Sequence, residues 1–376
     1  MPSSRPSGGL QPESRRGEAD DAAPARLPVT YVLPLRWHTD TGLAELTDYL
    51  RWLAARVDVV VVDGSPPDLF ARHGEAWRGL VRHRPPDPDR QGLNGKVVGV
   101  HTGIDAARHE QVVIADDDVR YDEAGLHAVH RLLDRVDLVR PQNYFYPLPW
   151  HAWWDTGRTL LNRALGDDYP GTLAIRRSTF LAMGGYDADV LFENLELIRT
   201  VRAYGGVEAA PAWLYVRRLP PDAAHFRGQR VRQAYDDLAQ PVRLLTALAV
   251  LPTMAVASRR PRLLLGLTLT VVALAETGRR RAAGNAVFPA STALAAPLWL
   301  LERGVCSWLA VAQRVLLGGV RYHHTRIRQP AHRPTPTRTT PTPTPPTPTT
   351  PTPTTPARTT PARTTPARAI LHFLRG

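Results

Sequence analysis

The chain has 376 residues, enough for one large domain with appendages or for two ordinary domains. Its formal net charge is +12, and residues 331–376 alone hold six arginines and no acidic residue. Because the basic residues are not interleaved with aromatic residues along one face, we expect no nucleic-acid partner. The single cysteine, Cys306, excludes a disulfide framework within the chain and fits a reducing compartment.

The first 27 residues are polar and rich in proline, glycine, serine and charge, a composition typical of disorder. They lack the apolar core of a signal peptide. We therefore expect the domain that follows to fold in the cytoplasm.

Strand and helix patterns alternate from residue 29 onward. Apolar runs rich in β-branched residues predict strands, and leucines or valines at helical spacing predict helices between them. The predicted strands are 29–35, 57–67 (stopped by Gly64, Ser65 and Pro66) and 111–115, and the predicted helices are 43–55 and 96–108. Runs without alternation indicate strands covered on both faces. We predict one doubly wound, mostly parallel α/β sheet domain over residues 28–240.

The second half of this domain, residues 141–240, is less regular and richer in aromatic residues. A helix is predicted at 192–206, where the paired glycines Gly205 and Gly206 stop it.

The run VVIADDDVRYD (112–122) places three aspartates at the end of a predicted central strand, where open α/β sheets bind ligands. Three adjacent carboxylates repel one another unless a positive charge compensates them. Asp116 and Asp118 share a face of an extended segment, and hard oxygen ligands at that spacing suit Mg²⁺ or Mn²⁺. A metal ion, an acid/base pair and a solvated acidic loop are all consistent with the pattern, and we favour the metal.

The order of these segments resembles the family 2 glycosyltransferases, in particular the ceramide glucosyltransferase-like members that attach sugars to lipids. The resemblance covers about residues 29–328 and implies a nucleotide-sugar donor. It implies that Asp63 contacts the nucleoside, that Asn94 to Lys96 precede the helix under the donor site, and that Asp116 and Asp118 hold the metal on the diphosphate. With Asp117, we place Asp63 and Lys96 among the donor-binding residues.

The segment LFENLELIRTVRAYGG (191–206) occupies the place of the family's Glu-Asp motif, whose aspartate is the catalytic base. This chain has Asn194 at that position, and an amide has no basic lone pair on nitrogen. The resemblance leaves Glu193, Glu196 or a residue elsewhere as the base, or an inactive protein. A solvated acidic helix start, stabilised by the helix dipole, is the structural alternative.

The segment HFRGQRVRQAYDD (225–237) resembles the family's Gln-x-x-Arg-Trp motif. Gln229 and Arg232 match it, and Gln233 replaces the tryptophan. The match implies that Arg232 grips the donor diphosphate with its bidentate guanidinium. An amphipathic basic helix at a membrane surface would give the same pattern.

Residues 241–320 contain apolar stretches that predict three or four membrane helices, at 242–257, 262–275, 286–301 and, along or across the membrane, 305–320. A buried helical domain is the alternative. A basic juxtamembrane segment (321–332) and a disordered Pro/Thr/Arg-rich tail (333–376) follow.

Together these features predict a multi-pass enzyme of the cell membrane with a cytoplasmic catalytic domain. It would transfer a sugar, with inversion, from a nucleotide sugar to a hydroxyl of a lipid or glycan acceptor, with Mg²⁺ or Mn²⁺. A catalytically silent scaffold and a nucleotidyltransferase are the alternatives.

Overall fold

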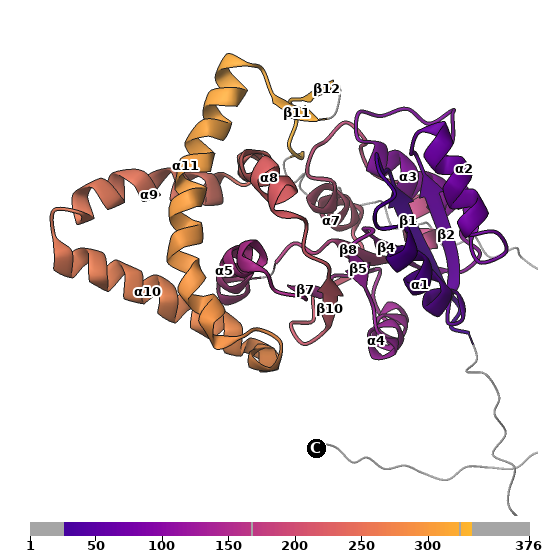
Figure 1. The fold of residues 1–376 in the computed structure, drawn as a ribbon, viewed down its shortest axis with the longest axis horizontal. Coiled ribbons are helices and arrows are strands. Elements are labelled where there is room, and N and C mark those ends of the chain that lie inside the picture. Colours follow the sequence, from indigo (N-terminus) through magenta and orange to yellow (C-terminus); the bar gives the residue numbers. More distant parts are fainter. Residues whose placement is uncertain (1–25, 167, 323–324, 333–376) are drawn as a thin grey trace, which may run out of the picture. The chain divides into compact units, whose positions relative to one another are not determined.

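A computed structural model describes residues 26–166, 168–322 and 325–332 (Figure 1). Most of the N-terminal segment and the Pro/Thr/Arg-rich tail, for which the sequence predicts disorder, lie outside the described residues.

The main sheet has seven strands, in an order typical of a doubly wound fold. The order is β3 (Arg82–Arg84), β2 (Asp58–Asp63), β1 (Val29–Leu35), β4 (Gln111–Ala115), β8 (Thr172–Arg176), β6 (Leu138–Val139) and β9 (Glu208–Ala209). Strands β1 to β4 are parallel, and β8 runs antiparallel to both its neighbours. The sheet is thus mostly parallel, as predicted.

Helices cover both faces of this sheet. Helices α1 (Leu43–Ala54) and α4 (Glu123–Leu133) pack on one face, and α3 (Gly95–Asp105), α6 (Arg177–Ala182) and α7 (Glu193–Tyr204) pack on the other. Helix α2 (Pro67–Ala76) follows β2. In β1, Tyr31 and Leu33 belong to the first core and Val32 to the second, so the strand is buried on both sides. This explains its uninterrupted apolar run.

A second sheet departs from the single sheet that we predicted. It has three strands in the order β5 (Val119–Arg120), β10 (Tyr215–Arg218) and β7 (Gln142–Phe145). Strand β5 directly follows the three aspartates, and its Val119 pairs with Arg218 of β10. This pairing brings Arg218 next to Asp118, which is 100 positions away in the sequence, at the end of β4.

The rest of the described chain is mostly helical. It comprises α5 (Trp150–Leu165), α8 (Ala223–Tyr235), η1 (Asp236–Ala239), α9 (Pro241–Ala257), α10 (Pro261–Arg280), η2 (Arg281–Ala286), η3 (Ala290–Leu294), α11 (Ala295–Leu316), β11 (Val320–Tyr322) and β12 (Thr325–Ile327). The predicted stretches 286–301 and 305–320 are not two separate helices. Short 3₁₀ turns precede one continuous helix, α11, which contains parts of both.

Helix α5 packs closely against both α10 and α11, and glycines allow the approach. A Cβ on Gly278 of α10 would lie 2.0 Å from the carbonyl oxygen of Leu160, and one on Gly157 of α5 would lie 2.9 Å from the backbone of Ala296. Real Cβ atoms do not approach so closely. An ion-paired group reinforces the packing, because Arg230 of α8 lies 2.8 Å from Asp155 of α5 and 2.5 Å from Glu302 of α11.

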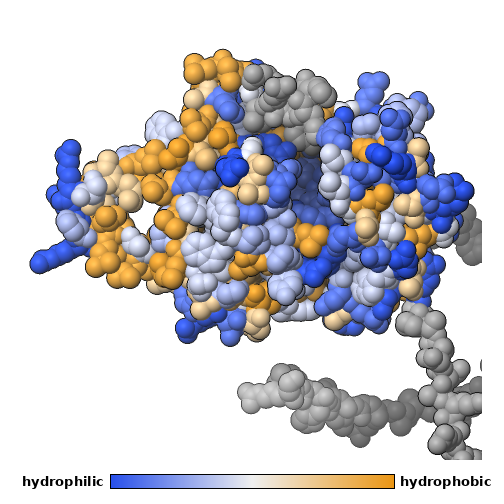
Figure 2. Space-filling model, in the orientation of Figure 1, coloured by the Kyte–Doolittle hydropathy of each residue, from blue (hydrophilic) through white to orange (hydrophobic). Residues whose placement is uncertain are grey.

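The outer faces of α9, α10 and α11 are apolar and exposed. Figure 2 shows hydrophobic side chains gathered over these helices. The most exposed include Val242, Leu245, Leu265, Leu269, Val315 and Leu316. In the described part of the chain, the stretches Pro261–Ala286 and Ala290–Leu316 are long and apolar enough to cross a membrane, whereas α9 is shorter.

The segment after β12 returns to the sheet domain. The backbone of Leu191 donates a hydrogen bond to Gln329 O at 3.0 Å, and Phe192 donates one to Pro330 O at 2.7 Å. Residues 329–332 of the predicted juxtamembrane segment therefore contact the chain immediately before α7.

Candidate active site

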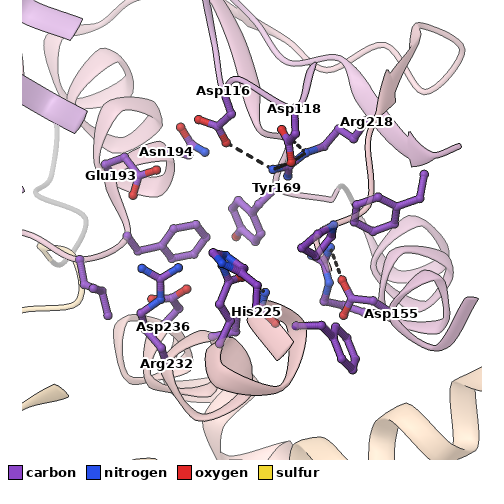
Figure 3. Close-up of a pocket in the computed structure, with 18 of the residues that line it drawn as sticks. Asp116, Asp118, Asp155, Tyr169, Glu193, Asn194, Arg218, His225, Arg232 and Asp236 are labelled. Carbon is purple, nitrogen blue, oxygen red and sulfur yellow. Dashed lines mark hydrogen bonds and ion pairs between the residues drawn. The ribbon is translucent and has the colours of Figure 1, made fainter. Parts of the chain in front are cut away.

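A cavity of about 380 Å³ lies at the carboxyl end of β4. Side chains from the second sheet, from the loop after β4 and from α3, α5, α7, α8, η1, α9 and α11 line it. They include Lys96, Asp116, Asp117, Asp118, Asp155, Tyr169, Glu193, Asn194, Arg218, Gln229, Arg232, Asp236, Arg243 and Arg303. In Figure 3, Asp116, Asp118 and Arg218 lie on one side, and Arg232, Asp236 and His225 lie on the opposite side.

Two cations of the protein itself compensate the three aspartates. Lys96 Nζ lies 2.5 Å from Asp116 Oδ1. Arg218 Nη2 lies 2.6 Å from Asp118 Oδ2 and 3.4 Å from Asp116 Oδ2. We predicted a metal ion in this role, but in this structure the guanidinium occupies the position between the two carboxylates. No local pattern in the sequence indicates that Arg218 pairs with these aspartates.

Gly171 makes room for the guanidinium. It immediately precedes β8, and its carbonyl accepts a hydrogen bond from Asp116 N at 3.0 Å. A Cβ there would lie 2.6 Å from the guanidinium carbon of Arg218 and 2.9 Å from Asp116 Oδ2. Any larger residue would displace Arg218 or Asp116.

Burial and charge shift the ionisation of this group. Burial raises the pKa of Asp118, and the charge of Arg218 only partly offsets it, so that the pKa reaches about 6. Burial alone would lower the pKa of Lys96, but the charges of Asp116 and Glu193 outweigh it and raise that pKa. Arg218 behaves likewise, with its pKa raised by Asp118 and Asp116 against the effect of burial. Both cations are therefore charged at neutral pH.

The start of α3 positions Lys96. Asn94 caps this helix, since its Oδ1 accepts a hydrogen bond from Lys96 N at 3.1 Å. Its Nδ2 donates to Val190 O at 3.0 Å, which ties the cap to the chain before α7. The ammonium of Lys96 thus lies between Asp116 and Glu193, 2.7 Å from Glu193 Oε1.

A second cavity, of about 540 Å³, adjoins the first. The ends of β1 and β2 and the first turn of α3 line it, through Leu35, Arg36, Gly64, Gly95 and Val98 among others. Lys96, Asp116 and Asp117 line both cavities. Trp37, which our sequence analysis missed, donates a hydrogen bond from Nε1 to Asp117 Oδ2 at 2.5 Å.

Asp63, predicted to contact the nucleoside, lines neither described cavity. Its buried carboxylate lies 2.7 Å from His73 Nδ1 and 3.0 Å from His83 Nε2, and it accepts a hydrogen bond from Ser65 N at 2.9 Å. Burial would raise the pKa of Asp63, but the hydrogen bonds from His83, Ser65 and His73 outweigh it and lower the pKa to about 2. These contacts tie the end of β2 to α2 and β3 through the Asp63 carboxylate.

The three residues that we assigned to the catalytic position lie in different surroundings. Glu193 and Asn194 line the cavity, but Glu193 is paired with Lys96 and Asn194 Nδ2 donates to Pro170 O at 2.9 Å. Glu196 is buried outside the cavity lining, where it accepts a hydrogen bond from His332 N at 2.7 Å and lies 2.8 Å from its Nδ1. Of these three residues, only Glu193 is both acidic and placed at the cavity.

The segment that resembles Gln-x-x-Arg forms one wall, since Gln229, Arg232 and Gln233 of α8 all line the cavity. Asp236, which directly follows α8, lines it as well and was not among the predicted residues. Its Oδ1 is buried and has no hydrogen-bond partner among the described residues. The adjacent acids Asp236 and Asp237 after a basic helix were the signal available in the sequence.

The oxygen ligands at the end of β4 are chemically suited to Mg²⁺ or Mn²⁺. Asp116 and Asp118 could share such an ion if Arg218 moved aside. As the side chains lie, no group of three or more His, Cys, Asp or Glu residues in the described ranges is arranged to hold a metal.

No family model and no curated protein sequence matches the chain. Several solved structures are similar to it. The mannosyltransferase PcManGT from Pyrobaculum calidifontis, in complex with GDP-Man and Mn²⁺, is 20% identical over 78% of this chain and 88% of that chain, with a TM-score of 0.47. S. aureus TarS 1–349 in complex with UDP-GlcNAc is 13% identical over 53% of this chain and 60% of that one, with a TM-score of 0.39.

A third similar structure is glucosyl-3-phosphoglycerate synthase from Mycobacterium tuberculosis, in complex with Mn²⁺, UDP and glucosyl-3-phosphoglycerate. It is 16% identical over 59% of this chain and 81% of that one, with a TM-score of 0.36. At this distance the likenesses do not decide what this chain does.

Proposed function

We propose that the protein transfers a sugar from a nucleoside diphosphate sugar to a hydroxyl group of a lipid or glycan at a membrane surface. The observation that carries the proposal is the pair of adjoining cavities with a shared wall of Lys96, Asp116 and Asp117. Such a pair accommodates a two-part donor, with the nucleoside in the cavity at β1 and β2 and the sugar in the cavity at α7 and α8. The diphosphate would then lie at the shared wall.

The charged groups near this wall suit a diphosphate leaving group. Lys96 is part of the wall, and Arg218 lines the sugar-side cavity near it, whereas Arg232 lies across that cavity (Figure 3). Guanidinium groups bind phosphate oxygens in a bidentate manner, and positive charge stabilises the negative charge that develops on a departing diphosphate. Asp116 and Asp118 are the residues that would hold Mg²⁺ or Mn²⁺, and the bound ion would supply further positive charge there.

The surroundings of the cavity suit an acceptor at a membrane. Gln240 and Arg243, at the start of α9, and Arg303 of α11 line the cavity, and the outer faces of these helices are apolar. An acceptor anchored in lipid could therefore reach the cavity along α9 and α11. We propose that these helices attach the protein to the cell membrane, with the sheet domain on the cytoplasmic side.

Calorimetry on the full chain in detergent tests the donor. UDP-glucose, UDP-GlcNAc and GDP-mannose are titrated with and without Mn²⁺, and at least one is expected to bind with a Kd below 1 mM, the upper end of ordinary substrate affinities. Asp116→Ala should weaken that binding at least tenfold. If none of these donors binds, the proposal is wrong, and release of pyrophosphate from nucleoside triphosphates would instead support a nucleotidyltransferase.

Asn194 favours a second candidate, a donor-binding protein without turnover. The amide stands where the resemblance expects the catalytic carboxylate, and it is bonded to the backbone. Binding of a nucleotide sugar without release of nucleoside diphosphate, in membranes or detergent, would support this candidate over the enzyme.

A further inference from the structure

We propose that Asp236 is the general base that removes the proton from the acceptor hydroxyl. This inference rests on the proposed sugar transfer and names the residue that replaces the missing aspartate at position 194. Nothing in the sequence resemblance assigns a role to Asp236.

The position of Asp236 carries the proposal. It begins the 3₁₀ turn that links α8 to α9, and it lines the cavity. Figure 3 shows it beside Arg232, across the cavity from Asp116 and Asp118. The proposed diphosphate site and the carboxylate therefore lie on opposite sides of the space left for the sugar. Direct displacement with inversion requires this arrangement, since the acceptor attacks from the side opposite to the leaving group.

Asp236 Oδ1 is also the carboxylate oxygen that the fold leaves without a partner. It is buried, and no described residue donates a hydrogen bond to it. Buried polar atoms are almost always paired, and exceptions cluster where a ligand or a catalytic role explains them. A hydroxyl of the acceptor would supply the missing donor.

The other acids near the cavity are engaged. Glu193 is paired with Lys96 at 2.7 Å. Asp237, the neighbour of Asp236, lies 3.5 Å from Arg243 Nε and 3.7 Å from Arg303 Nε. Asp155 is held by Arg230 at 2.8 Å and by Arg158 at 3.3 Å. A carboxylate held by a cation is a weaker proton acceptor than one without such a partner.

The charges that act most strongly on Asp236 are those of Arg232 on α8, Glu193 on α7, Asp237 on η1 and Arg303 on α11. Burial raises the pKa of Asp236, and the repulsion from Glu193 and Asp237 adds to this effect, while Arg232 and Arg303 act against it. The resulting pKa is about 8. A base whose pKa lies near the working pH is close to the optimum for proton transfer.

In the proposed step, a carboxylate oxygen of Asp236 takes the proton of the acceptor hydroxyl. The hydroxyl oxygen forms a bond to the anomeric carbon of the sugar, and the bond from that carbon to the diphosphate oxygen breaks. The bonding electron pair leaves with the nucleoside diphosphate. Protonated Asp236 then releases its proton to water.

The test uses the donor that binds and measures release of nucleoside diphosphate, with water as the acceptor, by the full chain in detergent. Asp236→Asn should lower kcat about 100-fold or more, because general base catalysis contributes 10²- to 10⁴-fold, and should change the donor Kd by less than about threefold. The rate of the wild type should rise with pH up to about 8. This rising limb of the pH–rate profile should be absent in the variant.

Asp237→Asn is the matched control, since it removes a carboxylate at the adjacent position. We expect it to keep the limb, because its carboxylate pairs with arginines. Asp236→Glu, which retains a carboxylate, should recover part of the rate lost in Asp236→Asn and serves if the asparagine variant does not fold. If Asp236→Asn keeps the limb, or if the wild type binds donor but releases no diphosphate, the proposal is overturned. If no donor binds, the failure lies with the proposed function.

Discussion

Arg218 donates hydrogen bonds to the carboxylate of Asp118 from Nε at 3.0 Å and from Nη2 at 2.6 Å, and the same Nη2 lies 3.4 Å from Asp116. The guanidinium thus bridges the two carboxylates that would share a metal ion. A cation of the protein and a divalent ion would compete for the same pair of ligands. In this geometry Arg218 would have to move aside before the two carboxylates could share a divalent ion.

The first prediction follows from this competition. Replacing Arg218 with glutamine leaves the two carboxylates without their shared cation, so Mn²⁺ should bind the variant more tightly. We expect a gain of about tenfold, which corresponds to about 1.4 kcal/mol. Titration calorimetry of Mn²⁺ into the full chain measures it. Arg217→Gln, on the same strand, is the control and should not change the affinity. Unchanged or weaker Mn²⁺ binding in Arg218→Gln would refute the competition.

The strand and helix pattern of the sheet domain could be predicted from the sequence, and the partners of its acidic residues could not. Hydrophobic periodicity is local, so β1, β2, β4 and α3 were found to within a few residues of their ends. Arg218 is separated from Asp118 by 100 residues and reaches it through the pairing of β10 with β5. Such a pairing of short strands has no periodic signal.

For the site residues, too, positions along the chain could be predicted and distant side-chain partners could not. The motif residues that line one cavity are Lys96, Asp116, Asp117, Asp118, Glu193, Asn194, Gln229 and Arg232. Their motifs follow strands and helices whose order along the chain sets their place in the fold. Asp63 ends its strand as predicted, yet its side chain turns to His73 and His83. A side chain's direction at a strand end depends on partners elsewhere in the chain, and these two histidines lie 10 and 20 residues further on.

The second prediction concerns Asp63. Its pKa is lowered from 3.8 to about 2 in the folded state, so the folded state holds fewer protons than the unfolded state between these values. The stability it contributes is present above pH 3.8 and is lost as the pH falls toward 2. Asp63→Asn should therefore lower the free energy of unfolding at pH 7 by about 2 kcal/mol, measured by urea denaturation, and leave the donor Kd unchanged. Asp68→Asn, at an exposed site on α2, is the control. Loss of donor binding with stability intact would restore the nucleoside role.

The third prediction tests the packing of α10 on α5. In Gly278→Ala the new methyl group would lie 2.0 Å from the carbonyl oxygen of Leu160, a backbone atom that cannot move alone. Overpacking of this kind costs about 1–3 kcal/mol, so the melting temperature in detergent should fall by several degrees. Gly266→Ala lies in the same helix with nothing within 4 Å of the added carbon. It should leave the melting temperature equal or slightly higher. Equal behaviour of the two variants would show that α10 does not pack on α5 this way.

The fourth prediction concerns the destabilisation of the folded state by the buried carboxylate of Asp236. Burial raises its pKa from 3.8 to about 8, so between these values the folded state keeps a proton that the unfolded state has released. Stability therefore falls as the pH rises from about 4 to 8, the opposite of the effect of Asp63. Asp236→Asn removes the titrating group and should melt higher than the wild type at pH 8, while the two should differ little at pH 4. Differential scanning fluorimetry across this range measures the difference, and Asp237→Asn should be less stable than the wild type at pH 8 because Arg243 and Arg303 lose their partner. A variant that melts lower than the wild type at pH 8 would mean that Asp236 is stabilised as the anion by a partner in the fold, and then its free oxygen could not mark the base.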